Sequence, residues 1–185
     1  MIRGLFSSAG TRTSRAKRIG EVVLLILVGV FQVAGSLGLR INMSPSLPVG
    51  LYITTHETAA QLVEFCPAEP YAHLAIERGY RDAGVCADGA APLLKPVIAQ
   101  RGDVVEVSPA GLSVNGRRLP NTAPIEADTK GRTLAAWPAG TYEVRPGTIW
   151  VASSYNRRSF DSRYFGPIAL AAVRDRVKPL ITGGK

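Results

Sequence analysis

The sequence predicts a mainly β domain of antiparallel strands that follows a single N-terminal helix. Three observations predict it: an uncharged apolar segment near the N-terminus, a series of short apolar or alternating runs after it, and abundant turn residues, with 19 Gly and 13 Pro among 185 residues. A chain of this length fits one main domain with a sizeable core. A hydrophobic fraction of 46% and a charged fraction of 19% exclude an intrinsically disordered chain.

Positive charge is concentrated at the N-terminus. The chain has 22 Lys and Arg against 14 Asp and Glu, a formal net charge of +8. Residues 1–20 contain five basic residues and no acidic one, so the rest of the chain carries 17 bases and 14 acids, only +3. Because the excess lies in this short tail, we expect no basic face for nucleic acid and no direct nucleic-acid partner.

An apolar segment follows the basic tail. Residues 22–39 carry no charge, and a helix of this length, at about 1.5 Å per residue, is just long enough to cross the hydrocarbon core of a bilayer. The preceding basic residues predict a cytoplasmic N-terminus and an exported remainder. A cleavable signal peptide is the alternative, with small residues at 34–36; a buried soluble helix fits less well because the segment lacks a polar face. The predicted parts are a basic cytoplasmic tail (1–20), a transmembrane anchor or signal peptide (21–39) and a periplasmic domain (40–185).

The predicted export of the domain bears on whether its two cysteines form a disulfide. Cys66 and Cys86 lie 20 residues apart, and neither belongs to a Cys-x-x-Cys pair or a His cluster, so we expect no metal site. In an oxidising compartment a disulfide is the natural pairing, with two separate buried thiols as the alternative. The sequence contains neither Gly-x-Gly-x-x-Gly nor a phosphate-binding loop, so we expect no cofactor.

Short strands are predicted along the whole exported domain. We expect them at residues 51–55, 62–65, 104–107, 112–114, 117–119, 141–144, 148–152 and 173–180, with a short helical turn at 72–77. Asn115-Gly116 separates two of these runs and is a strong hairpin signal, which makes residues 104–119 a meander. Residues 121–140 are predicted to form a long loop or a small insertion.

Two segments carry residues suited to catalysis. Residues 42–52 place Ser44 and Ser46 among prolines and a glycine that impose a non-helical backbone; a simple turn is the alternative. Residues 93–98 place Lys95 in an apolar run, where burial would lower the pKa of its amine and leave a base able to accept a serine proton. The alternative is a lysine that extends from a strand edge. The two histidines lie in no nucleophile motif, so a Ser-His-Asp triad has no base.

Together these segments resemble the sequence boxes of the bacterial signal peptidase family, and most closely its conjugative-transfer branch, the TraF-type pilin-maturation peptidases. Residues 46–52 (Ser-Leu-Pro-Val-Gly-Leu-Tyr) resemble the nucleophile box, residues 95–104 (Lys-Pro-Val-Ile-Ala-Gln-Arg-Gly-Asp-Val) the lysine box, and residues 159–166 (Ser-Phe-Asp-Ser-Arg-Tyr-Phe-Gly) the third box. Residues 77–86 are also typical of this branch. General leader peptidases have Met at the position of Leu47 and a proline one position later than Pro48, so the departure favours the conjugative branch.

The resemblance implies a signal-peptidase-like β domain with a Ser/Lys dyad. Ser46 would attack the scissile carbonyl, and Lys95 would act as general base and then as general acid. The Ser46 amide and the Ser44 hydroxyl would form the oxyanion hole, although Ser44 also competes with Ser46 as the nucleophile. The third box would hold the lysine amine and supply a supporting ion pair, for which a purely structural role is equally expected: Ser159, Asp161 and Arg163.

The resemblance also implies a function at the inner membrane. The domain would act in the periplasm on a pilin precursor, alongside other conjugative pilus assembly proteins, with Leu47 and Pro48 lining the substrate groove. The acyl-enzyme would pass either to water or to the amino terminus of the same substrate, which would cyclise the pilin; the sequence leaves this choice open. Two alternatives remain: a general signal peptidase for secreted proteins, and a non-enzymatic exported scaffold module of a transfer apparatus.

Overall fold

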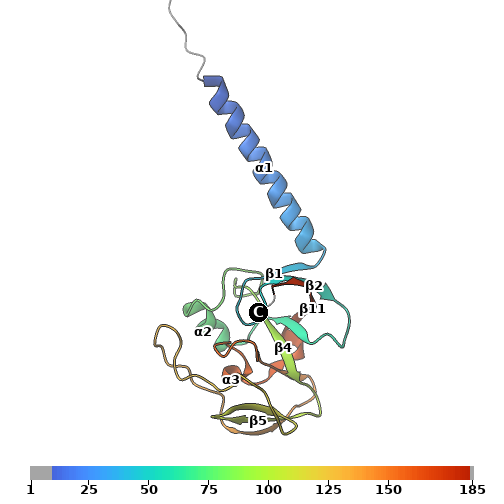
Figure 1. Ribbon diagram of the computed structural model, residues 1–185, viewed down its shortest axis with the longest axis vertical. Coiled ribbons are helices and arrows are strands. Elements are labelled where there is room, and N and C mark those ends of the chain that lie inside the picture. The colour runs from blue at the N-terminus through green and yellow to red at the C-terminus, as the bar shows by residue number, and fades with distance from the viewer. Residues whose placement is uncertain (1–9, 184–185) are drawn as a thin grey trace, which may run out of the picture. The chain divides into compact units, whose positions relative to one another are not determined.

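A computed structural model describes residues 10–183, which divide into two compact units, one ending at Leu39 and the other starting at Arg40 (Figure 1). The first unit is built on one helix, α1 (Gly10–Ser36), whose apolar side chains such as Leu24 and Leu25 are exposed. In the part of the chain that the structure describes, no helix combines the length and hydrophobicity that a membrane crossing requires. The assignment of residues 21–39 as an anchor or signal peptide stays a prediction.

The second unit is mainly β, as the sequence predicts. Its strands are β1 (Leu39–Asn42), β2 (Gly50–Thr55), β3 (Leu62–Phe65), β4 (Leu93–Ala99), β5 (Val104–Ser108), β6 (Gly111–Val114), β7 (Arg117–Arg118), β8 (Gly140–Glu143), β9 (Thr148–Val151), β10 (Ile168–Ala169) and β11 (Val173–Thr182). Its helices are short: α2 (Tyr71–Glu77), α3 (Ser162–Phe165) and a 3₁₀ turn at Leu170–Ala172.

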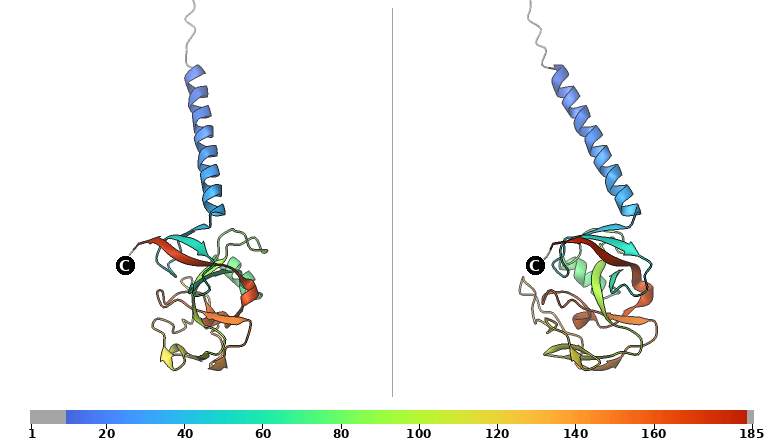
Figure 2. Two further views of the ribbon diagram at one scale, coloured as in Figure 1. Left: turned by 90° about the vertical axis from the view of Figure 1, so that its right-hand side faces the viewer. Right: turned by 45° about the vertical axis from the view of Figure 1, so that its right-hand side comes forward.

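The strands form two sheets. Seven strands follow the order β1-β2-β11-β3-β4-β9-β10, and four follow the order β7-β6-β5-β8. The ladders that join β2 to β11, β3 to β4 and β4 to β9 are antiparallel, as are those of the smaller sheet. Figure 2 shows the larger sheet curled, with the long β11 in red across it, and the smaller sheet at the end of the domain opposite β1 and β2. Two apolar clusters follow from this layout, one around Val63, Phe65 and Val151 and one around Val105, Leu112 and Trp150.

Strand β4 is central in the larger sheet, between β3 and β9, and it carries Lys95. It also contains Pro96, which cannot donate to a ladder and is expected at edges or bulges. The register between β4 and β9 shifts between Val97 and Ala99, shortly after the proline, whose own carbonyl accepts from the Ala152 N–H. The sequence predicts only an apolar run here, because a proline within such a run argues against a central strand.

Local signals predict most of the other elements correctly. The strands at 51–55 and 62–65 and the helical turn at 72–77 lie within one residue of the observed bounds. Asn115 and Gly116 have φ angles of 50° and 76°, the left-handed values that a tight hairpin turn requires. Residues 121–139 form the predicted loop, which contains one isolated bridge between Ala127 and Thr133.

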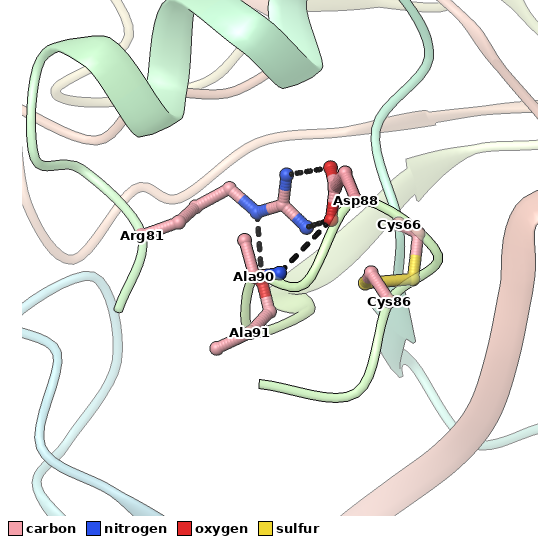
Figure 3. The surroundings of a disulfide bond; sticks show 6 residues. All are labelled: Cys66, Arg81, Cys86, Asp88, Ala90 and Ala91. Carbon is pink, nitrogen blue, oxygen red and sulfur yellow. Dashed lines mark hydrogen bonds and ion pairs between the residues drawn. A yellow bond between two sulfur atoms is a disulfide. The ribbon is translucent and has the colours of Figure 1, made fainter. Parts of the chain in front are cut away.

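A disulfide joins the end of β3 to the segment that leads into β4 (Figure 3). Cys66 directly follows β3, and Cys86 lies seven residues before β4. In the same segment Arg81 has a fully buried side chain that pairs with Asp88 at 2.6 Å and donates from Nε to the Ala91 carbonyl at 2.7 Å. These bonds hold the irregular segment in place just before the strand that carries Lys95.

Candidate active site

The nucleophile segment is a turn organised by the buried side chain of Asn42. Its amide nitrogen donates to the carbonyls of Ser44 (3.0 Å), Leu47 (3.3 Å) and Pro48 (3.1 Å), and its amide oxygen accepts from the Ser44 N–H (3.1 Å). An Asn side chain that bonds to nearby backbone in this way stabilises a turn. Asn42 therefore shapes the loop that presents Ser46.

The far end of this turn is held against the sheet. The Tyr52 hydroxyl donates to the Pro48 carbonyl at 2.7 Å. Gly50 has φ of +154°, and a Cβ at this position would lie 2.2 Å from the carbonyl oxygen of Ile181 on β11. The approach of β11 thus requires glycine four residues after Ser46.

Ser46 and Ser44 lie close together at the turn. Ser46 is 6% exposed and Ser44 is exposed. The Ser46 N–H donates to the Ser44 Oγ over 3.3 Å, so the two groups predicted to bind the oxyanion are adjacent and bond to each other. To stabilise a tetrahedral oxyanion, the Ser46 N–H would exchange this bond for one to the oxyanion, and the Ser44 hydroxyl proton would turn toward it.

Lys95 is buried in the sheet, with 3% of its surface exposed, directly opposite Val63 on β3. Among residues 10–183 no hydrogen bond or ion pair engages its amine. Burial lowers the pKa of Lys95 to about 8; Asp161 opposes this effect and Arg163 adds to it. A lysine without a partner and with such a pKa can lose its proton near neutral pH and act as a base.

Ser153 connects the lysine strand with the nucleophile turn. The Ala152 N–H donates to the Pro96 carbonyl at 3.0 Å, so Ser153 directly follows a residue that bonds to the lysine strand. The fully buried Ser153 hydroxyl donates to the Ser46 carbonyl. Nothing in the sequence singles out Ser153 as a site residue except its position six residues before the third box.

Two charged side chains of the third box hold the chain just after β9 in place. Asp161 and Arg163 have side chains that are 0% exposed, and they pair at 2.8 Å. The Asp161 carboxylate accepts from the Ser153 N–H (3.0 Å), and Arg163 donates to the carbonyl of Ser153 (2.8 Å). Arg163 also donates to the carbonyls of Asn121 and Arg157. A buried pair with this many hydrogen bonds positions two other chain segments, the loop that starts at Ser153 and the chain at Asn121.

Two predicted details differ from the observed geometry. The Ser159 hydroxyl is buried but has no hydrogen-bond partner in the described chain, so its predicted bond to the Lys95 amine is absent. Leu47 is 6% exposed and packs on Tyr52 and Val177, because the turn folds it back into the core. Leu47 is therefore a core residue, and the expectation that it lines an open groove is wrong.

The described residues bring the three boxes together at one place. The Ser46 carbonyl contacts Ser153, which bonds to both partners of the Asp161–Arg163 pair, and both charges of that pair act on Lys95. Within residues 10–183, no group of three or more His, Cys, Asp or Glu side chains is placed to hold a metal ion.

The sequence is similar to one protein family and to several known proteins of plasmid transfer. Residues 13–181 match the family model described as signal peptidase, peptidase S26. Plasmid transfer protein TraF of Escherichia coli is 37% identical over 166 residues, which cover 88% of this chain and 91% of that protein. The probable conjugal transfer protein TraF of Sinorhizobium fredii is 36% identical over 182 residues, covering 92% and 94% respectively.

Among solved structures, a crystal structure of a signal peptidase I from Enterococcus faecalis is similar, with 18% identity and a TM-score of 0.36. It covers 68% of this chain and 99% of that one. The family model spans all three boxes, and the relatives match over nearly their whole length. This chain belongs to the signal peptidase family, peptidase S26.

Proposed function

We propose that this protein is a Ser/Lys endopeptidase of conjugative transfer that processes a pilin precursor. The observation that carries the proposal is the buried Lys95, whose amine bonds to no residue that the structure describes and whose pKa is lowered by burial. The charges of Asp161 and Arg163 act on Lys95, and both residues bond to Ser153, which binds the carbonyl of Ser46. A desolvated lysine with a lowered pKa is the base that a serine nucleophile needs when no histidine serves.

In the proposed reaction the Ser46 hydroxyl proton passes to neutral Lys95 while the bond from Oγ to the scissile carbon forms. The Ser46 N–H and the Ser44 hydroxyl stabilise the oxyanion. Lys95 then gives the proton to the leaving nitrogen as the peptide bond breaks, which leaves an acyl group on Ser46. With a pKa of about 8, about a tenth of Lys95 is neutral at pH 7 and most of it above pH 9, so activity rises with pH over this range.

The acyl-enzyme can pass to two acceptors. Water yields simple proteolysis, whereas the amino terminus of the same substrate forms a new peptide bond and yields a cyclic product. The similarity to plasmid and conjugal transfer proteins supports a pilin precursor as the substrate and other pilus assembly proteins as partners. The disulfide supports a periplasmic location for the domain from residue 40 onward.

The test of this function is processing of the pilin precursor by the Ser46→Ala and Lys95→Ala variants. We expect each variant to lose about 10³-fold or more in processing rate, because each removes one partner of a coupled proton transfer. Mass spectrometry of the mature pilin reads out both the cleavage and the acceptor, since cyclisation removes one water from the cleaved chain.

Lys130→Ala is the matched control, because Lys130 is exposed in the loop that follows residue 120 and only its backbone N–H is hydrogen-bonded. Thermal melts of all three variants show whether they fold. A folded Ser46→Ala or Lys95→Ala variant that processes pilin at the normal rate would refute the dyad.

A further inference from the structure

The loop that leads from Ser153 to Ser159 lies beside the nucleophile. It starts at Ser153, whose hydroxyl donates to the Ser46 carbonyl and accepts from the N–H groups of Tyr155 (3.1 Å) and Asn156 (3.3 Å). Tyr155 is also close enough to Tyr52 of β2 to contribute to raising the pKa of its hydroxyl, after the larger effect of burial. The start of the loop is therefore attached to the same turn that presents Ser46.

The rest of the loop has a fixed backbone as well. The Arg157 carbonyl accepts from Arg163 at 2.8 Å, and the Arg158 N–H donates to the Asn156 side chain at 2.8 Å. The Ser154 carbonyl accepts from Asn121 at 2.9 Å. The backbone is held from two sides, while the Arg157 and Arg158 residues are exposed.

These two arginines carry positive charge that no neighbouring acid neutralises. Residues 41–52 and 152–160 contain no Asp or Glu. The nearest acidic residue in sequence, Asp161, is buried and already paired with Arg163. Neither Arg157 nor Arg158 forms an ion pair with any residue that the structure describes.

We propose that Arg157 and Arg158 form a carboxylate-binding site that selects substrates with an acidic group close to the scissile bond. The guanidinium group is permanently charged and binds carboxylates in a bidentate fork. Arg157 follows Ser153, which bonds to the Ser46 carbonyl, by four residues, and an extended chain advances about 3.3 Å per residue, so the proposed site accepts an acidic group a few residues from the cleaved bond. It is either an Asp or Glu side chain or a C-terminal carboxylate. This inference rests on the proposed peptidase function.

The test measures peptide binding to the full-length Ser46→Ala chain, so that cleavage does not enter the result. Fluorescent decapeptides built on an Ala-x-Ala cleavage pattern carry one Glu, or Gln as its neutral analogue, at one of the three positions on either side of the scissile bond. We expect the best Glu peptide to bind about five- to tenfold more tightly than its Gln counterpart. The Arg157→Gln/Arg158→Gln variant abolishes this preference.

The matched control is the Arg117→Gln/Arg118→Gln variant, which removes an adjacent exposed pair of arginines on β7. It keeps the preference. Peptides truncated after the scissile bond, with either a free or an amidated C-terminus, show whether the site binds a terminal carboxylate or an acidic side chain. A preference for either kind of carboxylate supports the site. Equal affinity for Glu and Gln peptides and for free and amidated termini, or a preference that survives in the Arg157/Arg158 variant, would overturn it.

Vesicles of phosphatidylglycerol and of phosphatidylcholine test the other anionic surface available to the arginines. If the Arg157/Arg158 variant loses binding only to the anionic vesicles, with an unchanged peptide preference, the pair binds membrane and the proposal is wrong. Cleavage of the same peptides by the wild-type chain is followed in parallel. A wild-type chain that binds with the Glu preference but cleaves neither peptide nor pilin contradicts the peptidase function and leaves the carboxylate site standing.

Discussion

Lys95 is suited to catalysis because its environment destabilises its charge. Its folded-state pKa of about 8 lies below the ordinary value of 10.5, a difference that corresponds to about 3 kcal/mol. Below pH 8 both the folded and the unfolded chain hold the proton, so the folded state bears the full free-energy cost of burying the charged amine. As pH rises from 8 toward 10.5 the folded state releases its proton first, and the penalty disappears.

Replacing Lys95 with methionine therefore stabilises the protein while it removes the base. Methionine fills a similar volume with an adaptable apolar chain. At pH 7 we expect Lys95→Met to raise the free energy of unfolding by about 1–3 kcal/mol, and the gain to shrink between pH 8 and pH 10. Urea unfolding of the full chain at pH 7 and pH 10 measures both values. Lys130→Met, at an exposed site, serves as control; a Lys95→Met chain less stable than wild type at pH 7 would contradict this account.

Ser153 bonds to the carbonyl of Ser46, the proposed nucleophile, and is expected to act on turnover by positioning it. Loss of its hydroxyl in Ser153→Ala removes one hydrogen bond, worth about 1 kcal/mol, so kcat falls about five- to tenfold while KM changes less than twofold. The pH midpoint of activity stays in place, because the Ser153 N–H still holds Asp161 near Lys95.

Ser154→Ala is the control for this substitution, since only the backbone carbonyl of Ser154 is hydrogen-bonded. Steady-state kinetics over pH 6 to 10 separate the effects. Unchanged kcat in Ser153→Ala, or a shifted pH midpoint, would show that Ser153 does not position Ser46 in this way.

At the scale of elements, the disulfide determines how firmly β3 and β4 meet around Lys95. Cys66 ends β3, and Cys86 belongs to the segment that enters β4 (Figure 3). The ion pair between the buried Arg81 and the exposed Asp88 lies in the same segment, so covalent and ionic contacts act on one stretch of backbone.

We expect the Cys66→Ala/Cys86→Ala variant to lose about 3 kcal/mol of stability, the value for a loop of this length, and about 10 °C in melting temperature. Circular dichroism melts with and without reductant measure the change. The wild type treated with reductant should have the melting temperature of the variant, and reductant should not change the melting temperature of the variant. Equal melting temperatures for wild type and variant would show that the non-covalent contacts alone hold the segment.

The elements that depend on local signals could be predicted from the sequence, and those that depend on partners could not. The Asn115-Gly116 hairpin follows from the φ angles that these two residues tolerate. Strand β4 has a proline in its centre, and its register with β9 shifts shortly after that proline. That shift depends on a strand some 50 residues further along the chain, so no local pattern contains it.

At the scale of the whole molecule, the order of the boxes picked out three segments that the fold brings together, but not the contacts that join them. The Asn42 and Ser153 side chains shape and hold the nucleophile turn, yet each looks like an ordinary turn residue in the sequence. The Ser153 hydroxyl acts on a carbonyl 107 residues away. A linear pattern cannot report such a pairing. The predicted contact between Ser159 and Lys95 failed for the same reason: neighbourhood in a motif does not define geometry.

The buried pair of Asp161 and Arg163 affects how active and inactive members of the family can be told apart from their sequences. It bonds to backbone from two separate segments, the 153–159 loop and Asn121, so selection for a stable fold alone would retain it. A homologue that has lost its chemistry would keep the third box and drift at Ser46 and Lys95. Pseudoenzymes in this family are then recognised by an intact third box beside a substituted nucleophile or base, and motif searches that weight the third box most heavily would count them as active.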